Sequence, residues 1–402
     1  MEESTDLPHI ASGIYNRRHH NSTGDVNQLW KNQPTFLISQ AVYIIAGIIT
    51  LVHGIEWMVQ TGDVNQLWKN QPTILISQAV YIIAGIITLV HAFKKGGRWP
   101  YFWIGALLHG IYADNFWHFV LPEYDNFWHS QTPIMFLGGR LPLHIILLYP
   151  VFMYHAAYAV SKLHLPGYAE AFAVGLVTVL IDLPYDIVAV KFVHWTWHDT
   201  DPNINDRSYW VPWNSYYFHA TFTASFFYIF NASRRWFAPK VAQWESAGKK
   251  IEWKSLVIAT LLGMPGGVLL FVPIYHPLHD VYKIHTEVTF FLLFTIYAAF
   301  TIYGLLSARE KAMFTPTFID YILILQLAIH FITYWVFVVW FNPENEVSVG
   351  LHEPVGPCNE MANRAEYITV ISTILILAAS VFYSLYFRTC QAVALARKLK
   401  TK

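Results

Sequence analysis

The chain has 402 residues, of which 55% are hydrophobic and only 13% are charged, whereas a typical soluble domain carries about 25% charged residues. Lys+Arg and Asp+Glu are 26 each, and this balance excludes a basic nucleic-acid-binding surface and an acidic disordered tail. The two cysteines exclude a disulfide scaffold and a cysteine-rich zinc module. We therefore expect the lipid bilayer as a partner, and no nucleic acid.

Apolar runs of about 20 residues recur along the chain, and this length is enough for a helix to cross a bilayer. Lipid offers the backbone no hydrogen-bond partner, so each run is predicted to be helical, and its continuous apolar character argues against a β-barrel. We expect an all-α, polytopic transmembrane helical bundle at 36–388, between a polar segment at 1–35 and a basic tail at 389–402. The ten predicted spans are 36–59, 74–93, 100–122, 141–160, 168–192, 213–233, 255–275, 286–308, 317–341 and 367–387.

Basic residues are distributed unequally between the two sets of loops that these spans would separate. The two termini and the loops after the second, fourth, sixth and eighth spans contain 20 of the 26 Lys and Arg residues, and the other side contains six. Because basic loops are retained in the cytoplasm, both termini are predicted to be cytoplasmic. The densest cluster, at 234–254, is interpreted as a topology anchor, with an anionic-lipid patch as the alternative.

The first two predicted spans belong to a duplicated segment. Residues 23–53 and 61–91 differ at one position in 31, Phe36 against Ile74, which indicates a recent duplication or a wrongly joined gene model rather than an old transporter repeat. If both copies insert, the protein has ten spans. If only one inserts, it has nine, and the N-terminus moves to the opposite side of the membrane. We favour ten.

Polar chemistry is concentrated on the side opposite the basic loops. A first motif occurs twice, as Asp114-Asn-Phe-Trp-His118 and as Asp125-Asn-Phe-Trp-His129. On a helix, residues four apart share one face, so each Asp can reach its His. An ionisable residue within a span, such as Asp114, indicates a functional site. The alternative is an interfacial tryptophan belt whose polar side chains face water.

The fifth span ends in a pair of carboxylates, Asp182 and Asp186, with Pro184 between them. Carboxyl groups that face each other acquire different proton affinities, so that one can act as a general acid and the other as a general base. His219 follows in the next span. We interpret these three residues, Asp182, Asp186 and His219, as candidate catalytic residues.

A second set of side chains is predicted to bind a metal. His194 and His198 have the i,i+4 spacing that can hold an ion on a helix, although this spacing is also common by chance. His276, His279 and Asp280 follow the seventh span. With the first pair they would provide mixed His and Asp ligands, which suit zinc or iron. The alternative is a polar turn that caps two helices.

Three further features are given simpler interpretations. The sequence Gly263-Met-Pro-Gly-Gly267 predicts a break in the seventh span, and broken helices mark cavities in membrane proteins. The acidic loop at 342–366 is interpreted as solvated. Histidines inside predicted spans are expected to form hydrogen bonds between helices; these are His109, His144, His155 and His330.

From about residue 100 to residue 387 the chain resembles a family of multi-pass animal membrane proteins known as a domain of unknown function. Three strings carry the resemblance: Asp182-Leu-Pro-Tyr-Asp186, His194-Trp-Thr-Trp-His198 and Tyr209-Trp-Val-Pro-Trp213. It implies a polytopic fold and no particular activity. Locally, the aspartate, the Trp-x-Trp motif and the tyrosine–proline motif are similar to those of membrane carotenoid hydratases, which add water to an isoprenoid end group. This second resemblance implies acid–base chemistry at Asp182 and Asp186.

Three functions are compatible with these patterns. The first is a membrane-embedded enzyme that modifies a lipid or an isoprenoid, with its site on the non-cytoplasmic side and a lipophilic small molecule as substrate. The second is a proton-coupled transporter or channel, which would use the carboxylates and histidines as a relay. The third is a structural or receptor-like protein with a solvated polar layer. We place the enzyme slightly ahead.

Overall fold

The computed structural model describes residues 63–120, 127–197, 205–242, 245–307, 315–349 and 360–388. The chain divides into two units, Met1–Ile55 and Glu56–Lys402, and everything described here belongs to the second. The polar segment at 1–35, the predicted span at 36–59, the first copy of the repeat and the tail at 389–402 lie outside the described residues. The second copy of the repeat forms α3 and most of α4.

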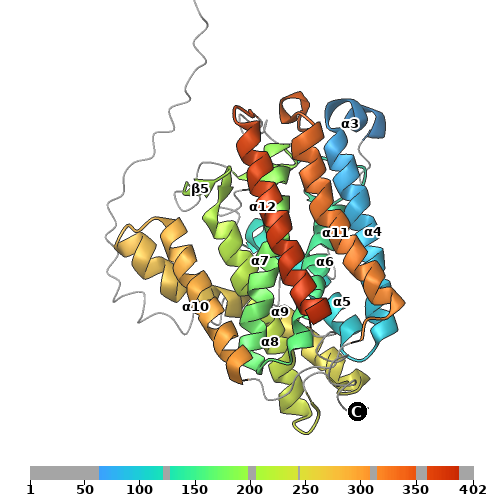
Figure 1. The fold of residues 1–402 in the computed structure, drawn as a ribbon, viewed down its shortest axis with the longest axis vertical. Helices are drawn as coiled ribbons and strands as arrows, with labels where there is room; N and C mark the ends of the chain where they lie inside the picture. The colour runs from blue at the N-terminus through green and yellow to red at the C-terminus, as the bar shows by residue number, and fades with distance from the viewer. Residues whose placement is uncertain are drawn as a thin grey trace, which may run out of the picture. The chain divides into compact units, whose positions relative to one another are not determined.

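Helices dominate this unit (Figure 1). They are α3 (Val64–Asn70), α4 (Pro72–Lys95), α5 (Trp99–Val120), α6 (Leu143–Val160), α7 (Gly167–Lys191), α8 (Trp213–Phe237), α9 (Lys249–Tyr275), α10 (Thr286–Ser307), α11 (Phe318–Trp340) and α12 (Arg364–Tyr383). Seven of the described helices are long and apolar enough to cross a membrane, namely α4, α6, α7, α9, α10, α11 and α12. The all-α fold is thus confirmed, and the seven helices are compatible with a multi-pass membrane protein.

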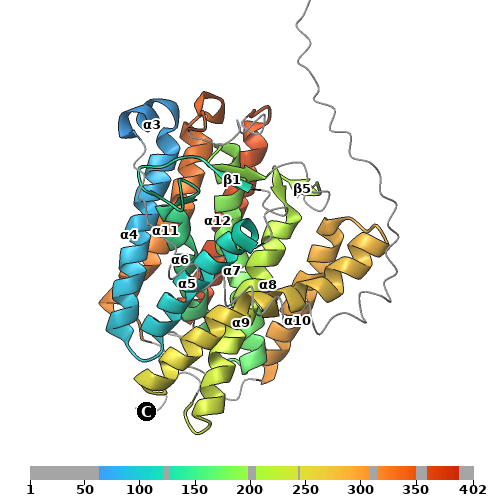
Figure 2. The ribbon, with the colours of Figure 1, turned by 180° about the vertical axis from the view of Figure 1, so that it is seen from behind.

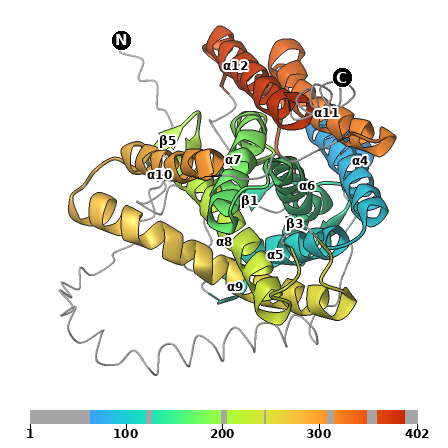
Figure 3. The same cartoon turned by 60° about the horizontal axis from the view of Figure 1, so that its bottom comes forward.

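Helices α6 and α7 form the centre of the bundle, and the other long helices surround them (Figure 3). In the most apolar 18-residue stretch of each helix, the buried share is 83% for α6 and 89% for α7, but only 22% for α12. A peripheral helix can leave its apolar surface to lipid, whereas a central one must satisfy every polar side chain inside the protein. Polar residues on α6 and α7 therefore need protein partners or a ligand.

Glycines allow α8 to approach the helices on either side of it. A Cβ at Gly175 on α7 would lie 2.6 Å from the backbone oxygen of Ala220 on α8, and one at Gly267 on α9 would lie 2.3 Å from the ring of Phe222. The predicted break at 263–267 is wrong, because α9 is continuous from Lys249 to Tyr275. Its glycines serve close helix packing, a common use of small residues in membrane proteins.

Short antiparallel strand pairs lie at the end of the bundle that also carries α3 (Figure 2). They are β1 (Phe127–His129) with β4 (Trp195–Trp197), β2 (Met135–Phe136) with β3 (Leu141–Pro142), and β5 (Arg207–Ser208) with β6 (Val211–Pro212). Hydrogen bonds also connect the loop residues next to these strands with one another and with the helix ends: the Ser130 N–H donates to the His194 carbonyl, and the Gln71 side chain donates to the Phe192 and Val193 carbonyls. The loop residues at this end therefore have fixed positions.

Candidate functional site

Asp182 and Asp186 lie one turn apart on the central helix α7, and both are fully buried. Pro184, between them, has no N–H to donate to the carbonyl four residues earlier. The helix continues through this position because neighbouring helices pack on it. Their i,i+4 spacing places the two carboxylates on one face, as the sequence predicted.

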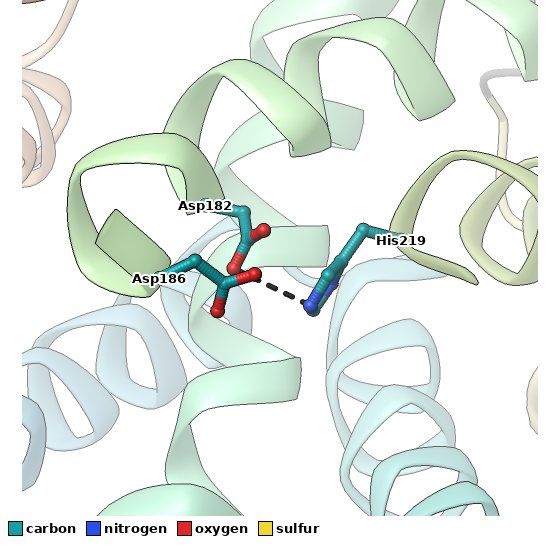
Figure 4. Close-up of side chains that lie close together, drawn as sticks. All are labelled: Asp182, Asp186 and His219. Atoms are coloured by element: carbon teal, nitrogen blue, oxygen red, sulfur yellow. Dashed lines mark ion pairs between the residues drawn. The ribbon is translucent and has the colours of Figure 1, made fainter. Parts of the chain in front are cut away.

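His219 on α8 completes a group of three with these carboxylates (Figure 4). Its Nε2 lies 3.3 Å from Oδ1 of Asp182. One donor atom from each of the three residues lies within 4.8 Å of the other two. The close packing of α7 on α8 brings these residues together, so the structure unites all three residues that the sequence predicted as catalytic.

The carboxylates have few partners for their charge. Ser215 donates its hydroxyl to Oδ2 of Asp186 at 2.7 Å. Both oxygens of Asp182 and Oδ1 of Asp186 are buried and accept no hydrogen bond within the described residues, where neither carboxylate forms an ion pair with Lys or Arg. A carboxylate buried without a countercharge is costly, so this arrangement calls for a proton or a cation.

A cavity of about 360 Å³ lies beside this group and is lined in part by His219 and Ser215. His109, Asp114 and His276 add polar groups to its wall. Most of the remaining wall is apolar or aromatic, including Tyr149, Phe152, Trp195, Trp197, Phe218 and Phe271. Its volume and lining are those of a site for an apolar small molecule with a few polar contacts.

His194 lies outside this group, at the end of the bundle that carries the strands. Its Nε2 contacts the hydroxyl of Thr73 at 2.8 Å, and Thr73 in turn forms hydrogen bonds to the carboxyl group of Glu346. Burial lowers the pKa of His194 well below its usual value, and the neighbouring His144 adds to this effect. A neutral His194 that bonds to Thr73 has a structural role here. Its predicted metal-binding partner, His198, lies outside the described residues.

A separate, more exposed cluster contains His276, His279 and Asp280. Asp206 and His285 also belong to it. Asp280 contacts both His276 and His279. Asp206 lies 3.5 Å from His279 and 3.2 Å from His285. Burial raises the pKa of Asp206, but hydrogen bonds from Thr286 and the charges of the two histidines lower it overall. In the described part of the chain, His194 does not come close enough to this cluster to share one ion with it.

The remaining predictions have mixed outcomes. Asp114 lines the cavity, but the side chains of His118 and Asp125 lie outside the described residues. His155 bonds to Gln326, and His330 to the Ile181 carbonyl, as expected. The expectation for His144 is wrong, because neither ring nitrogen has a hydrogen-bond partner in the described residues.

Sequence reasoning missed two functional features. Ser215 supports Asp186 from α8, and the aromatic cavity draws its walls from elements as distant as β4 and α9. Ser215 and His219 have i,i+4 spacing, which places both on one helix face. That spacing was the only available signal for Ser215.

The chain was compared with known proteins. No curated protein and no solved structure matches it significantly. One family model matches residues 50–364, a range that includes the whole second copy of the repeat and the complete candidate site. The chain therefore belongs to the family described as domain of unknown function DUF7802.

Proposed function

We propose that the protein is a membrane-embedded enzyme that modifies a lipophilic small molecule, such as a lipid or an isoprenoid, by proton transfer. The observation that carries this proposal is the buried group of Asp182, Asp186 and His219 beside an aromatic-lined cavity. Acid–base catalysis needs proton-exchanging side chains next to the bound substrate. His219 and Ser215 reach the cavity wall, and the carboxylates lie behind them.

Each side chain has a role that follows from its position. His219 exchanges a proton with the substrate, because it lines the cavity. Asp182 lies against its Nε2 and stabilises the ring when it carries a proton. Ser215 holds the Asp186 carboxyl group through its hydrogen bond. The resemblance to carotenoid hydratases agrees with acid–base chemistry and stays a prediction.

The alternative functions have less support. A broken seventh span would favour a transporter, but α9 is continuous. A structural or receptor-like protein with a solvated polar layer does not require two fully buried carboxylates without a cation beside them. The enzyme therefore remains the preferred proposal.

A comparison of cellular lipids tests this function. We expect cells that express the wild-type protein to change the amount of one lipid species in their membranes, as detected by mass spectrometry. With Asp186→Asn or His219→Gln this change should be at least about 100-fold smaller, as for loss of a general acid or base. Glu287→Gln is the matched control, since Glu287 is an exposed carboxylate. If wild type and Asp186→Asn give the same lipid profile at equal folded yield, the proposal fails.

For the topology we propose ten spans with both termini in the cytoplasm. Support comes from the 20-to-6 distribution of basic residues and from helices α5 and α8, which coincide with predicted spans outside the seven most apolar ones. In sealed membrane vesicles of known orientation, an impermeant thiol reagent should label Lys249→Cys and Glu287→Cys from opposite sides. Labelling of Ser22→Cys from the same side as Lys249→Cys supports ten spans. Labelling from the opposite side supports nine.

A further inference from the structure

We propose that Asp182, Asp186 and His219 bind one divalent transition-metal ion (zinc, manganese or iron(II)) inside the helical bundle. This assigns the metal to the residues that the sequence indicated as catalytic, rather than to His194, His198, His276, His279 and Asp280. The inference rests on the proposed function and changes one role in it: an ion on Nε2 of His219 would keep a proton off that nitrogen, so that water on the ion would exchange the proton with the substrate. Binding of the ion can be measured without any knowledge of the substrate.

The first argument is electrostatic and rests on the other buried carboxylates of the bundle. Asp320 lies 2.7 Å from the Lys95 ammonium. Glu252 lies 2.9 Å from the Arg234 guanidinium, and Glu170 lies 3.8 Å from that of Arg98. Buried carboxylates normally have such partners. Among the described residues, the partners of Asp182 and Asp186 are a histidine, a serine hydroxyl and each other's carboxyl group, so a bound cation would supply the missing positive charge.

The second argument is geometric. Ligand atoms about 2.0–2.2 Å from one zinc ion are about 3–3.6 Å apart in tetrahedral coordination. The 3.3 Å separation between His219 Nε2 and Asp182 Oδ1 already has this value, and all three donor atoms lie within 4.8 Å of one another. These separations allow the three side chains to reach one common ion.

The third argument concerns the surroundings of the ligands. Ser215 donates to Oδ2 of Asp186, and such outer hydrogen bonds orient metal ligands. Oδ1 of Asp186 is buried and accepts no hydrogen bond in the described residues, so it is available to an ion. Three protein ligands leave a coordination position for water, as in catalytic metal sites. One imidazole with two carboxylates suits zinc, iron or manganese.

Metal analysis of the purified full-length protein tests the inference. After dialysis against Zn²⁺ or Mn²⁺ and removal of free ions, we expect about one equivalent of metal by mass spectrometry. Asp182→Asn, Asp186→Asn and His219→Gln should each reduce the affinity at least about 10-fold. His279→Gln is the matched control, because it removes an imidazole from the exposed cluster on the same side of the bundle. Its metal content should stay at the wild-type value.

Thermal unfolding provides a second measurement that does not depend on variant yield. Added Zn²⁺ or Mn²⁺ should raise the Tm of the chelator-treated wild-type protein and of His279→Gln, since a ligand that binds only the folded state stabilises it. The Tm of Asp186→Asn should rise less at the same metal concentration, because its affinity is lower. A wild-type protein that binds neither ion overturns the inference and indicates that the two carboxyl groups share a proton. Metal that is lost in His279→Gln but kept in Asp186→Asn also overturns it.

The two proposals fail separately. If the protein binds metal at Asp182, Asp186 and His219 but changes no lipid, the proposed function is wrong and the metal site stands. If the wild-type protein modifies the lipid but binds neither Zn²⁺ nor Mn²⁺, the enzyme stands and the metal site is wrong.

Discussion

Two sites with buried carboxylates in this bundle differ in the number of hydrogen-bond donors around them. Asp320 lies in the first turn of α11, where it accepts hydrogen bonds from Tyr158, Lys95 and Thr317 and contacts His91. Asp182 and Asp186 lie on α7, equally buried, and share one histidine and one hydroxyl. The chain thus provides several donors for one carboxylate and hardly any for two others.

This difference distinguishes a structural role from a functional one. A carboxylate with a full set of donors ties helices together, as Asp320 does for α4, α6 and α11. Carboxylates that lack donors destabilise the fold unless a proton or an ion is present, and such local conflicts are typical of functional sites. The groups around Asp182 and Asp186, more than their residue type, make them the candidate functional carboxylates.

The largest expected effect is on the free energy of unfolding, which should change in opposite directions when an Asp of each site is replaced by Asn. Asp320→Asn leaves Lys95 and His91 without their buried countercharge, and breaking a buried ion pair costs about 3–5 kcal/mol. Asp182→Asn removes one of two neighbouring negative charges, so in chelator-treated protein we expect the free energy of unfolding to stay equal or to rise. Denaturant unfolding of both variants in the same detergent measures the difference.

Equal destabilisation by the two variants would contradict this comparison, because it would mean that Asp182 has structural partners comparable to those of Asp320. The test becomes sharper when it is repeated with saturating Zn²⁺. The bound ion should reverse the sign for Asp182→Asn, since only the wild-type protein would then gain stability from metal binding.

The sequence predicted the helices well and the site in part. Apolar length alone gives α4 through α12 to within a few residues, because lipid leaves the backbone no other choice. The pair Asp182 and Asp186 was visible because both lie on one helix. The proximity of His219 depends on the packing of Gly175 against Ala220, and no local pattern in the sequence encodes that contact between helices.

One error and one local exception have physical causes that a single sequence does not reveal. Glycines 263, 266 and 267 on α9 allow close packing as readily as they break a helix, and the choice depends on the neighbouring helix. The acidic loop at 342–366 was interpreted as solvated, and Glu344 and Glu366 are exposed. Glu346 is the exception at 2% exposed, and it accepts hydrogen bonds from Thr73, far away in the sequence.

Glu346 is another buried carboxylate, and it accepts hydrogen bonds from Thr73. Burial raises its pKa from the ordinary 4.5 to about 7, against the opposing effect of the hydrogen bonds from Thr73. Because the folded-state pKa exceeds the unfolded one, protonated Glu346 favours folding. Its contribution to stability is complete below about pH 4.5 and is lost as the pH rises through 7.

We therefore expect the free energy of unfolding of the wild-type protein to fall between pH 5 and pH 8 by up to about 3 kcal/mol from this residue, at about 1.4 kcal/mol for each pKa unit. Glu346→Gln should remove this part of the pH dependence, because its amide does not titrate. Glu344→Gln, two residues away and exposed, should retain it. If Glu346→Gln and wild type show the same pH profile, the Glu346 carboxylate keeps its charge at pH 5, which contradicts the raised pKa.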